Sequence, residues 1–342
     1  MNLGQKKTIV AITMGDPAGI GPEIVIKTLQ EKEIYEICNP IVIGSINILK
    51  KAVSILDVNL VFNKIESPKE AICKFGNIDV IEPVEYNYDN IKFGAVQADA
   101  GRMSYAYIKK SIELGMNKEV DAVATAPINK EAIKAAGVPQ VGHTEIFQEL
   151  TNSEYALTMF SVRNLRVFFV SRHISLKAAC DYATKERVLQ FVININKELS
   201  KLGIMNPRIA VAALNPHGGD GGMFGREEIE QLIPAVEEAK KRGINAVGPV
   251  PADSVFHLGL QGKYDAILSL YHDQGHIACK TLDFERSVTI TLGLPFIRSS
   301  VDHGTAFDIA GKGIASAVSL IEATRLSAKY SKMMKEVNEI YK

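Results

Sequence analysis

The sequence has no excess of charge of either sign. Its 342 residues include 39 Lys and Arg and 39 Asp and Glu, so the formal net charge at pH 7 is zero. Binding to nucleic acid or to an anionic membrane surface needs a concentrated basic surface. The composition therefore argues against both kinds of partner, and any bound phosphate must be recognised by a local site.

Long apolar runs and export signals are also missing. No apolar stretch approaches the ~20 residues that a membrane-spanning helix needs. The N-terminal segment carries two lysines before a strand-like run and shows no signal-peptide cleavage pattern. We therefore expect a cytoplasmic protein.

Cysteine is scarce. The four cysteines, Cys38, Cys73, Cys180 and Cys279, lie far apart and form no C-x-x-C pair. This spacing disfavours both a disulfide framework and a thiolate zinc site. We predict four reduced cysteines in the core.

What the sequence does contain is a repeated β-then-α pattern. Short β-branched runs end in Gly, Pro, Asn or His, and most precede a segment with helical periodicity, which is typical of an α/β fold with a parallel sheet. At ~150 residues per domain, the length suggests two domains or two lobes. The predicted strands are Thr8–Thr13, Pro40–Ile43, Ala122–Ala124, Leu165–Val170, Arg208–Leu214 and Ala266–Leu270. The predicted helices are Pro22–Gln30, Ala98–Leu114, Thr144–Leu150, Lys185–Lys201, Arg226–Lys241 and Ser316–Val337, with Gly115 and Gly243 as C-caps.

Three histidines follow three separate predicted strands, namely His173, His217 and His272. In open parallel sheets, ligands gather beyond the carboxyl ends of the strands. A hydrogen-bonded loop histidine is the commoner role for any one of them, but three in the same topological place favour a divalent metal site with open positions for substrate oxygens. Two further histidines are weaker candidates. His257 is interpreted as structural, and His276, four residues after His272, is interpreted as a residue that lines the His272 loop without binding the metal.

Two turns could bind an anion. The segment GDPAGIGPEI, residues 15–24, joins the first strand to a helix that opens with Pro22, but it departs from G-x-G-x-x-G and lacks the Lys-Ser/Thr of a P-loop. A tight structural turn explains it equally well. The segment GHTE, residues 142–145, places His143 beside Thr144, a candidate helix N-cap whose neighbouring amides could hold an anion.

Basic and glycine residues gather near the C-terminus. Lys280, Arg298 and the run from Val301 to Gly313 lie in an otherwise apolar region. Isolated Lys and Arg are usually solvated surface groups. Arg298, however, follows TLGLPFI, which suits a residue that reaches from a buried strand end toward a phosphate or carboxylate.

Together these motifs resemble one family. MGDPAGIGPEI, GHTE, NPHGGDGG, GPVPADSVF, YHDQGH and GLPFIRSSVDHGTAFDIAG are similar to segments of 4-hydroxythreonine-4-phosphate dehydrogenases, and the match runs essentially from end to end. The resemblance implies an isocitrate/isopropylmalate dehydrogenase-like α/β fold with two α/β/α lobes around a central cleft. It also implies a homodimer with shared active sites, a dinucleotide-binding lobe of residues 1–135 plus 278–342, and a metal-binding and dimerisation lobe of residues 136–277.

The resemblance also implies roles for single residues. The metal ligands would be His173, His217 and His272, holding zinc, magnesium, manganese or cobalt. Asp253 and Lys280 would be catalytic, with Lys280 acting in proton transfer or only as a phosphate anchor. The substrate contacts would be His143, Thr144, Lys280, Thr289 and Arg298. The contacts to NAD or NADP would be Gly15, Asp16, His303, Gly304 and Asp308.

One segment departs from the family pattern. Where the biosynthetic enzymes usually read KYQGFGRGVN, residues 280–289 read KTLDFERSVT, so Thr289 stands where a substrate-contacting Asn is expected. A hydroxyl there replaces a carboxamide that offers both a donor and an acceptor. This segment looks like the branch that acts on phosphorylated four-carbon sugar acids such as 4-phospho-D-threonate.

The predicted reaction is a metal-dependent, NAD(P)-linked oxidation of a 4-phosphorylated 3-hydroxy acid followed by decarboxylation. The substrate is either 4-phosphohydroxythreonine, in pyridoxal phosphate biosynthesis, or 4-phospho-D-threonate, which would give dihydroxyacetone phosphate and carbon dioxide. The alternatives are a metal-dependent hydrolase or lyase without a nucleotide, and a non-catalytic sugar-phosphate sensor. The glycine-containing run from Val301 to Gly313 argues against both, since neither needs a dinucleotide loop.

Overall fold

The computed structural model describes residues 7–85, 90–140 and 142–340. The chain divides into two compact units. The first unit is Met1–Ala156 with Val288–Lys332, and the second unit is Leu157–Ser287 with Met333–Lys342. Residues 136–156 thus belong to the first unit, and residues 278–287 and Met333–Lys342 belong to the second, so three segments differ from the predicted lobe boundaries.

Packing explains the differences at residues 136–156 and 278–287. Helix α6 (His143–Leu150) packs against α4 (Ala98–Met116) of the first unit, and α11 (His272–Leu282) packs against strands of the second. Each helix therefore belongs to the unit whose elements cover its apolar face. Hydrophobic periodicity in the sequence does not show which elements those are.

The first unit is built on a mostly parallel sheet. Its strands lie in the order β3-β4-β2-β1-β5-β12-β11, and only β11 runs antiparallel to its neighbour β12. The strands are β1 (Thr8–Thr13), β2 (Cys38–Ile43), β3 (Val61–Lys64), β4 (Asn77–Ile81), β5 (Ala122–Thr125), β11 (Val288–Leu292) and β12 (Ile297–Val301). The other helices are α1 (Gly21–Leu29), α2 (Lys32–Ile37), α3 (Ile46–Leu56), the 3-10 turn η1 (Pro68–Glu70), α5 (Lys130–Ala135) and α12 (Val318–Ile340).

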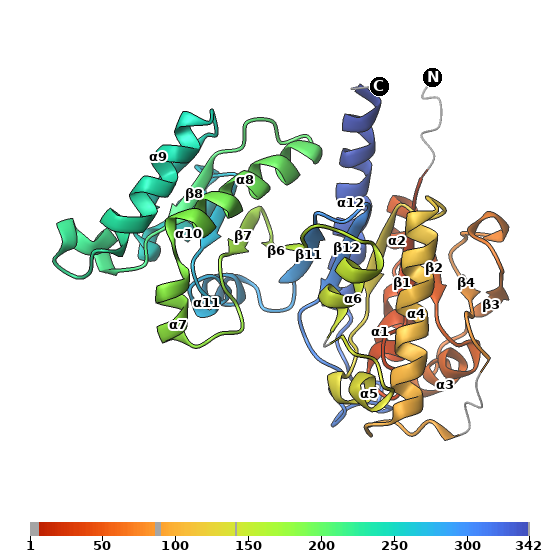
Figure 1. The fold of residues 1–342 in the computed structure, drawn as a ribbon. Helices are drawn as coiled ribbons and strands as arrows, with labels where there is room; N and C mark the ends of the chain where they lie inside the picture. The colour runs from red at the N-terminus through yellow and green to blue at the C-terminus, as the bar shows by residue number, and fades with distance from the viewer. Residues whose placement is uncertain (1–6, 86–89, 141, 341–342) are drawn as a thin grey trace. The chain divides into compact units, whose positions relative to one another are not determined.

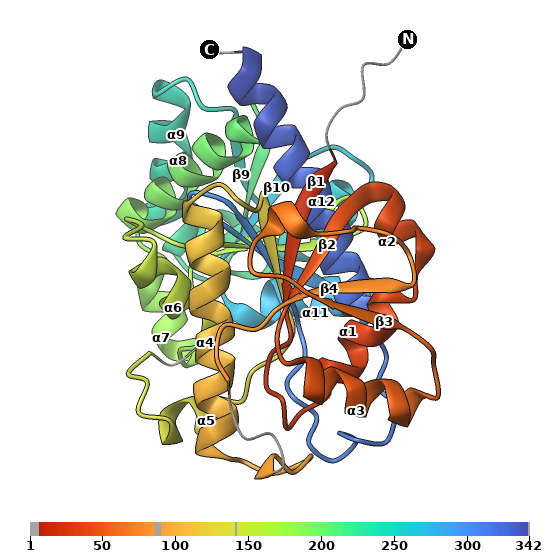
Figure 2. The ribbon, with the colours of Figure 1, turned by 90° about the vertical axis from the view of Figure 1, so that its right-hand side faces the viewer.

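Helices cover both faces of this sheet. Figure 2 shows α4 on one side of β1 and β2, and α1 and α12 on the other. Because of this cover, β1, β2 and β5 are buried along almost their whole length. Continuous apolar strands of this kind are typical of parallel sheets.

The strands of the second unit lie in the order β6-β7-β10-β8-β9, and Figure 1 labels three of them, β6, β7 and β8. Strand β6 runs antiparallel to β7, and the other neighbours are parallel. The strands are β6 (Leu157–Val162), β7 (Leu165–Phe169), β8 (Ile209–Ala212), β9 (Ala246–Val250) and β10 (Ala266–Ser269). The other helices are α7 (Leu176–Tyr182), α8 (Lys185–Lys201), the 3-10 segment η3 (Pro216–Gly222), the π-helical turn η4 (Glu228–Leu232), α9 (Ile233–Lys241) and α10 (Ala252–Leu260).

The two predicted glycine caps have different outcomes. Gly243 follows α9 with a φ of +77°, and its N–H donates to the carbonyl of Lys240, so this cap is confirmed. The prediction for Gly115 is wrong, because α4 continues to Met116. Gly115 is instead a site of close packing, since a Cβ atom there would lie 2.6 Å from Cε1 of Phe296.

As predicted, no disulfide joins the four cysteines, all of which lie among the described residues, but they are not all core residues. Cys38 and Cys279 are buried, whereas Cys73 and Cys180 are partly exposed, so the predicted core location is wrong for these two. Within the described part of the chain, no helix is long and apolar enough to cross a membrane.

Candidate active site

The turn between β1 and α1 packs tightly against neighbouring backbone. Gly15 adopts a φ of +74°, and a Cβ atom there would overlap the carbonyl oxygen of Pro127. A Cβ atom at Gly21 would likewise overlap the carbonyl oxygen of Met14. Asp16 is fully buried, and its N–H donates to Pro127 at 2.9 Å. Close backbone packing therefore explains why glycine occupies positions 15 and 21. Contact of Gly15 and Asp16 with a cofactor stays a prediction.

Helix α1 holds the C-terminal glycine loop by its backbone. The buried carboxylate of Glu23 accepts hydrogen bonds from the N–H groups of Gly311, at 2.5 Å, and Gly313, at 2.7 Å. One turn later, Lys27 donates to the carbonyls of Gly313 and Ala315 at 2.8 and 2.6 Å. The segments GPE (residues 21–23) and AGKG (residues 310–313) are far apart in the sequence, but these hydrogen bonds hold them together in the fold. The sequence analysis quoted Glu23 inside a motif without assigning it this function.

The first half of the same loop offers groups that fit a ligand. The N–H of Ile20 donates to the carbonyl of Thr305 at 3.0 Å, which joins this segment to the β1–α1 turn. Nδ1 of His303 lies 3.0 Å from the carbonyl oxygen of Gly304, while its Nε2 is buried with no partner among the described residues. Gly304 and Asp308 are exposed. A buried imidazole nitrogen beside an exposed turn is compatible with a bound dinucleotide.

Arg298 lies on β12 with its guanidinium between two threonine hydroxyls. The residue is only 3% exposed. Its Nη1 donates to Oγ1 of Thr291 at 3.2 Å, and its Nη2 donates to Oγ1 of Thr125 at 2.7 Å. Thr289 is two residues before Thr291 on β11 and therefore shares its face of the sheet with Arg298. The two hydroxyl partners carry no signal in the sequence, because only the strand register brings them to Arg298.

His143 lies near this arginine in the first unit. It is the first residue of α6, whose Phe147 packs with its ring centroid 5.4 Å from Cζ of Arg298 and 6.5 Å from the centroid of the His143 ring. Nε2 of His143 is buried with no partner among the described residues. Burial holds the pKa of His143 well below its usual value, and the charge of Arg298 lowers it further. A neutral imidazole beside a buried guanidinium is suited to an anionic ligand.

The predicted N-cap is placed differently. Gly142 is the N-cap of α6, so Thr144 is the second residue of the helix and the prediction that it caps the helix is wrong. Its predicted contact with substrate stays a prediction.

In the second unit, the three candidate metal ligands follow three adjacent parallel strands. His173 follows β7, His217 follows β8 and His272 follows β10, and β10 pairs with both β7 and β8. This confirms their placement beyond the carboxyl edge of one sheet. The described residues of a single chain nevertheless contain no group of three His, Cys, Asp or Glu that could hold a metal ion. The complete ligand set stays a prediction.

Two of these imidazoles lie close together, and one of them, His272, is held by neighbouring side chains. The ring centroids of His173 and His272 are 6.0 Å apart. Nδ1 of His272 lies 2.6 Å from a carboxylate oxygen of Asp273, which leaves Nε2 for a metal. The ring of His276 stacks on His272 at 4.0 Å and on Phe169 at 4.3 Å. His276 therefore supports a candidate ligand in addition to lining the same segment.

His217 opens a backbone segment with an unusual conformation. His217 has a φ of +55°, and every residue from there to Gly222 also has a positive φ. Glycine adopts such angles without strain, which explains the GG pairs of NPHGGDGG. The non-glycine residues His217 and Asp220 adopt them at a cost, and strain of this kind is concentrated at functional sites.

A buried carboxylate holds the start of this segment. One oxygen of Glu228 accepts hydrogen bonds from the N–H groups of Leu214 and Asn215 at 2.8 and 2.7 Å. The other accepts from Nδ2 of Asn215 at 2.8 Å. A Cβ atom at Gly219 would lie 2.8 Å from the same carboxylate. Sequence reasoning missed Glu228, because its partners become neighbours only through the fold.

The predicted catalytic pair lies on two helices of the second unit. Lys280 is eight residues after His272 on α11, so it shares a helix face with His272 and His276. Its Nζ lies 5.1 Å from the ring centroid of Phe284. Asp253 is exposed in the first turn of α10. Their catalytic roles stay predictions. His257, interpreted as structural, lies 3.0 Å from Gln261 through Nε2.

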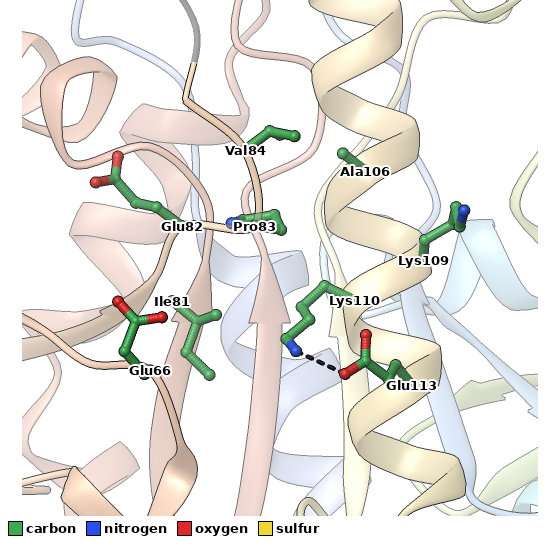
Figure 3. Close-up of a pocket in the computed structure, with 9 residues that line it drawn as sticks. All are labelled: Glu66, Ile81, Glu82, Pro83, Val84, Ala106, Lys109, Lys110 and Glu113. Carbon is green, nitrogen blue, oxygen red and sulfur yellow. Dashed lines mark hydrogen bonds and ion pairs between the residues drawn. The ribbon is translucent and has the colours of Figure 1, made fainter.

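A separate cavity of about 360 Å³ lies between the end of β4 and α4 (Figure 3). Glu66 and Glu82 line one side, and Lys109 and Lys110 line the other. Lys110 pairs with Glu113 at 2.7 Å, so part of the charge is already balanced. None of the predicted site residues lines this cavity, and we do not assign it to the active site.

Comparison with known proteins agrees with this arrangement. The model of the family described as "Pyridoxal phosphate biosynthetic protein PdxA" matches residues 36–327. The chain belongs to the PdxA family. It is 56% identical over 326 residues to a protein from Halalkalibacterium halodurans named "Putative D-threonate 4-phosphate dehydrogenase", covering 95% of this chain and 98% of that protein.

Solved structures show the same relationship. The crystal structure of a 4-hydroxythreonine-4-phosphate dehydrogenase from Klebsiella pneumoniae matches with a TM-score of 0.88 and 38% identity, covering 95% of this chain and all of that one. The enzyme of the same name from Burkholderia phymatum matches with a TM-score of 0.85 and 40% identity, covering 95% and 99%. The predicted family and its isocitrate dehydrogenase-like α/β fold are confirmed, as is the assignment to a family of dehydrogenases.

Proposed function

We propose that this protein oxidises and decarboxylates 4-phospho-D-threonate with NAD or NADP, giving dihydroxyacetone phosphate and carbon dioxide. The C3–H hydrogen leaves as a hydride to the nicotinamide, and the C3 hydroxyl loses its proton. The resulting β-keto acid loses its carboxylate as carbon dioxide, and C2 gains a proton. Atoms and electrons balance with one oxidised nucleotide consumed for each acid.

The observation that carries the choice of substrate is Thr289. By its resemblance to the family pattern, Thr289 stands where the biosynthetic enzymes usually have a substrate-contacting Asn, and it lies on the same sheet face as Arg298. Relatives named for D-threonate 4-phosphate are 53% to 56% identical to this chain, whereas the solved enzymes named for 4-hydroxythreonine-4-phosphate are 38% to 42% identical. Both observations favour a hydroxylated substrate over an aminated one.

The first unit provides groups for the anionic part of the substrate. The guanidinium of Arg298 and the neutral imidazole of His143 would bind a phosphate or carboxylate. The guanidinium supplies the positive charge, and the imidazole supplies an additional hydrogen bond. The exposed turn at Gly304 and Asp308 would contact the dinucleotide. The choice between NAD and NADP stays open in this proposal.

The second unit provides the groups for the reacting carbons. A divalent metal, when bound, would lower the pKa of the substrate hydroxyl and stabilise the negative charge that decarboxylation leaves. His173 and His272 would hold it, with His217 of the partner subunit completing the set. Lys280, on the same helix face as His272, would move a proton to or from the substrate, with Asp253 orienting the participating groups.

The deciding experiment compares two substrates. We expect the purified protein, supplied with a divalent metal and NAD⁺ or NADP⁺, to produce NADH or NADPH absorbance with 4-phospho-D-threonate at a kcat/KM at least about tenfold above that with 4-phosphohydroxythreonine. Thr289→Asn should shift this ratio toward the amino compound, because it restores the carboxamide that the pattern of the biosynthetic enzymes has at this position. Thr289→Ser is the matched control, since it keeps the hydroxyl.

Two outcomes would contradict the proposal. A wild-type preference for the amino compound would overturn the choice of substrate, and absence of nucleotide reduction with either acid would overturn the reaction. Dihydroxyacetone phosphate, detected by a coupled glycerol-phosphate dehydrogenase, identifies the product. The homodimer and the cytoplasmic location stay predictions that this assay does not test.

A further inference from the structure

The guanidinium of Arg298 is held by hydroxyls from two different strands. Thr291 on β11 is directly opposite Arg298 in the antiparallel register, and its Oγ1 accepts from Nη1 at 3.2 Å. Thr125 ends the parallel strand β5 on the other side of β12, and its Oγ1 accepts from Nη2 at 2.7 Å. Both threonines are fully buried. The side chain is thus fixed from both sides of its own strand.

The hydrogen bonds of Thr125 also fix the direction of its hydroxyl. Thr125 donates to the carbonyl of Ser299 at 3.1 Å, so its hydrogen points toward β12 and a lone pair is left for Arg298. A threonine χ1 is stiff, because the methyl group and the hydroxyl occupy two of the three staggered positions. The acceptor therefore has a defined place before any ligand arrives.

These two partners orient the guanidinium without neutralising it. A hydroxyl carries no charge, so neither bond cancels the positive charge of Arg298, as a carboxylate would. The planar guanidinium places its donors in one fixed fork, so anchoring one donor on each terminal nitrogen fixes the plane of the whole group. The ring of Phe147, 5.4 Å from Cζ, restricts the remaining movement.

We propose that Thr125 and Thr291 are positioning residues that set the plane of the Arg298 guanidinium for an oxyanion of the substrate. This inference rests on the proposed function and deepens it. The oxyanion is the phosphate or the carboxylate of the acid, which share the chemistry that a guanidinium recognises. The orientation of Arg298 is then part of substrate recognition, and the two hydroxyls act through the arginine.

The test uses Thr125→Val and Thr291→Val, which are nearly isosteric and remove the hydroxyl that accepts from Arg298; Thr125→Val also removes the hydrogen bond that Thr125 donates to Ser299. We expect each variant to raise the KM for 4-phospho-D-threonate by about tenfold or more, because a lost hydrogen bond to a charged group weakens the arginine's alignment. The KM for the nucleotide should stay within about twofold of the wild type. Thr125→Ser and Thr291→Ser keep the hydroxyl and should restore the wild-type KM for the acid.

The chain offers a matched control for simple loss of stability. Thr324 is a fully buried threonine of the same unit whose hydroxyl donates within its own helix, to the carbonyl of Leu320 at 2.8 Å, and has no other hydrogen bond among the described residues. Thr324→Val should lower the melting temperature without changing the KM for the acid. If Thr125→Val does not fold, Thr291→Val carries the test, because it removes the bond to the other nitrogen.

Two further measurements separate this inference from the proposed function. Calorimetric titration of the wild type and the valine variants with inorganic phosphate, and with D-threonate, needs no turnover. Weaker binding of phosphate by the variants identifies the phosphate as the oxyanion, and weaker binding of D-threonate identifies the carboxylate. Either result supports the positioning role even if 4-phospho-D-threonate is not oxidised. Unchanged binding of both ligands and an unchanged KM would overturn the inference, as would an equal effect of Thr324→Val.

Discussion

Asp16 is an acidic residue with no access to solvent. Its Oδ1 accepts from the N–H of Ala18 at 2.8 Å, while its Oδ2 is buried with no partner among the described residues. Burial raises the pKa of Asp16 to about 6, against the opposing effect of the Ala18 hydrogen bond. The tight turn after β1 therefore encloses a carboxyl group whose ionisation costs free energy in the native state.

Asp16→Asn should make the protein less sensitive to rising pH. Between pH ~4 and ~6 the unfolded carboxyl ionises while the native one keeps its proton, so the wild type loses roughly 3 kcal/mol of stability from this group across the window. Asparagine has no such proton. The free energy of unfolding of the variant, relative to the wild type, should therefore rise by roughly that amount from pH 4 to pH 7 in urea denaturation.

The exposed Asp57→Asn variant controls for the removal of one negative charge. A difference between Asp16→Asn and the wild type that does not vary with pH would show that Asp16 has the same pKa in both states.

Single residues were predictable where the sequence surrounds them with a distinctive motif. Arg298 was predictable because a basic residue follows the apolar run TLGLPFI and precedes two serines, although the structure places it inside β12 and not at the end of a strand. Thr125 and Thr291 were not, because a threonine that ends or occupies a strand is ordinary, and only the pairing of β5, β12 and β11 brings the two hydroxyls to one guanidinium. Long-range register is the information that a single sequence does not show.

At the scale of elements, the π-helical turn η4 and the left-handed segment η3 depend on each other. Glu228 is the first residue of η4, and its carboxylate receives three hydrogen bonds from Leu214 and Asn215, immediately before His217. π-helical turns often occur at functional sites, because they re-aim side chains that a regular helix would place elsewhere. Here the turn places the buried carboxylate of Glu228 against the backbone that immediately precedes the candidate metal ligand His217.

Glu228→Gln should therefore destabilise the protein more than its nearly unchanged volume suggests. One carboxylate oxygen becomes an NH₂ group that faces N–H donors, so buried donors lose their acceptor at a cost of about 2 kcal/mol or more. Urea denaturation measures this loss. Glu198→Gln is the matched control, since Glu198 is a buried glutamate of the same unit whose ion-pair partner Lys201 is largely exposed. Equal destabilisation by both variants would contradict a special function of Glu228.

Element prediction succeeded where apolar runs are long and buried. The predicted strand Thr8–Thr13 and the predicted helix Lys185–Lys201 have the bounds that the structure shows. Strand β3 was missed because its four residues are half-exposed, and β12 because serines and an arginine interrupt its pattern. The helix predicted from Arg226 begins instead with the turn η4, because hydrophobic periodicity does not distinguish a π turn from an α turn.

At the scale of the whole molecule, the second unit leaves large apolar side chains exposed near its candidate site. Met223 and Phe224, which follow the His217 segment, are 75% and 50% exposed, and Ile277 and Phe284, on and after α11, are 64% and 68% exposed. Clusters of exposed apolar residues mark protein–protein contact surfaces. These exposed side chains are compatible with a second copy of the chain as the partner, and the homodimer stays a prediction.

Mixed dimers test whether the metal ligands come from both subunits. If His173 and His272 of one chain join His217 of the partner subunit, a dimer of one His173→Ala chain and one His217→Ala chain keeps one intact site, because both defects fall in the other site. Such a dimer, purified through two different affinity tags, should contain about half the zinc or cobalt of the wild type, whereas each parent homodimer contains almost none. The matched pairing of His173→Ala with His272→Ala damages both sites and should bind almost no metal. Equal metal contents in the two mixed dimers would contradict this division of the ligands, because under it only the pairing of His173→Ala with His217→Ala keeps an intact site.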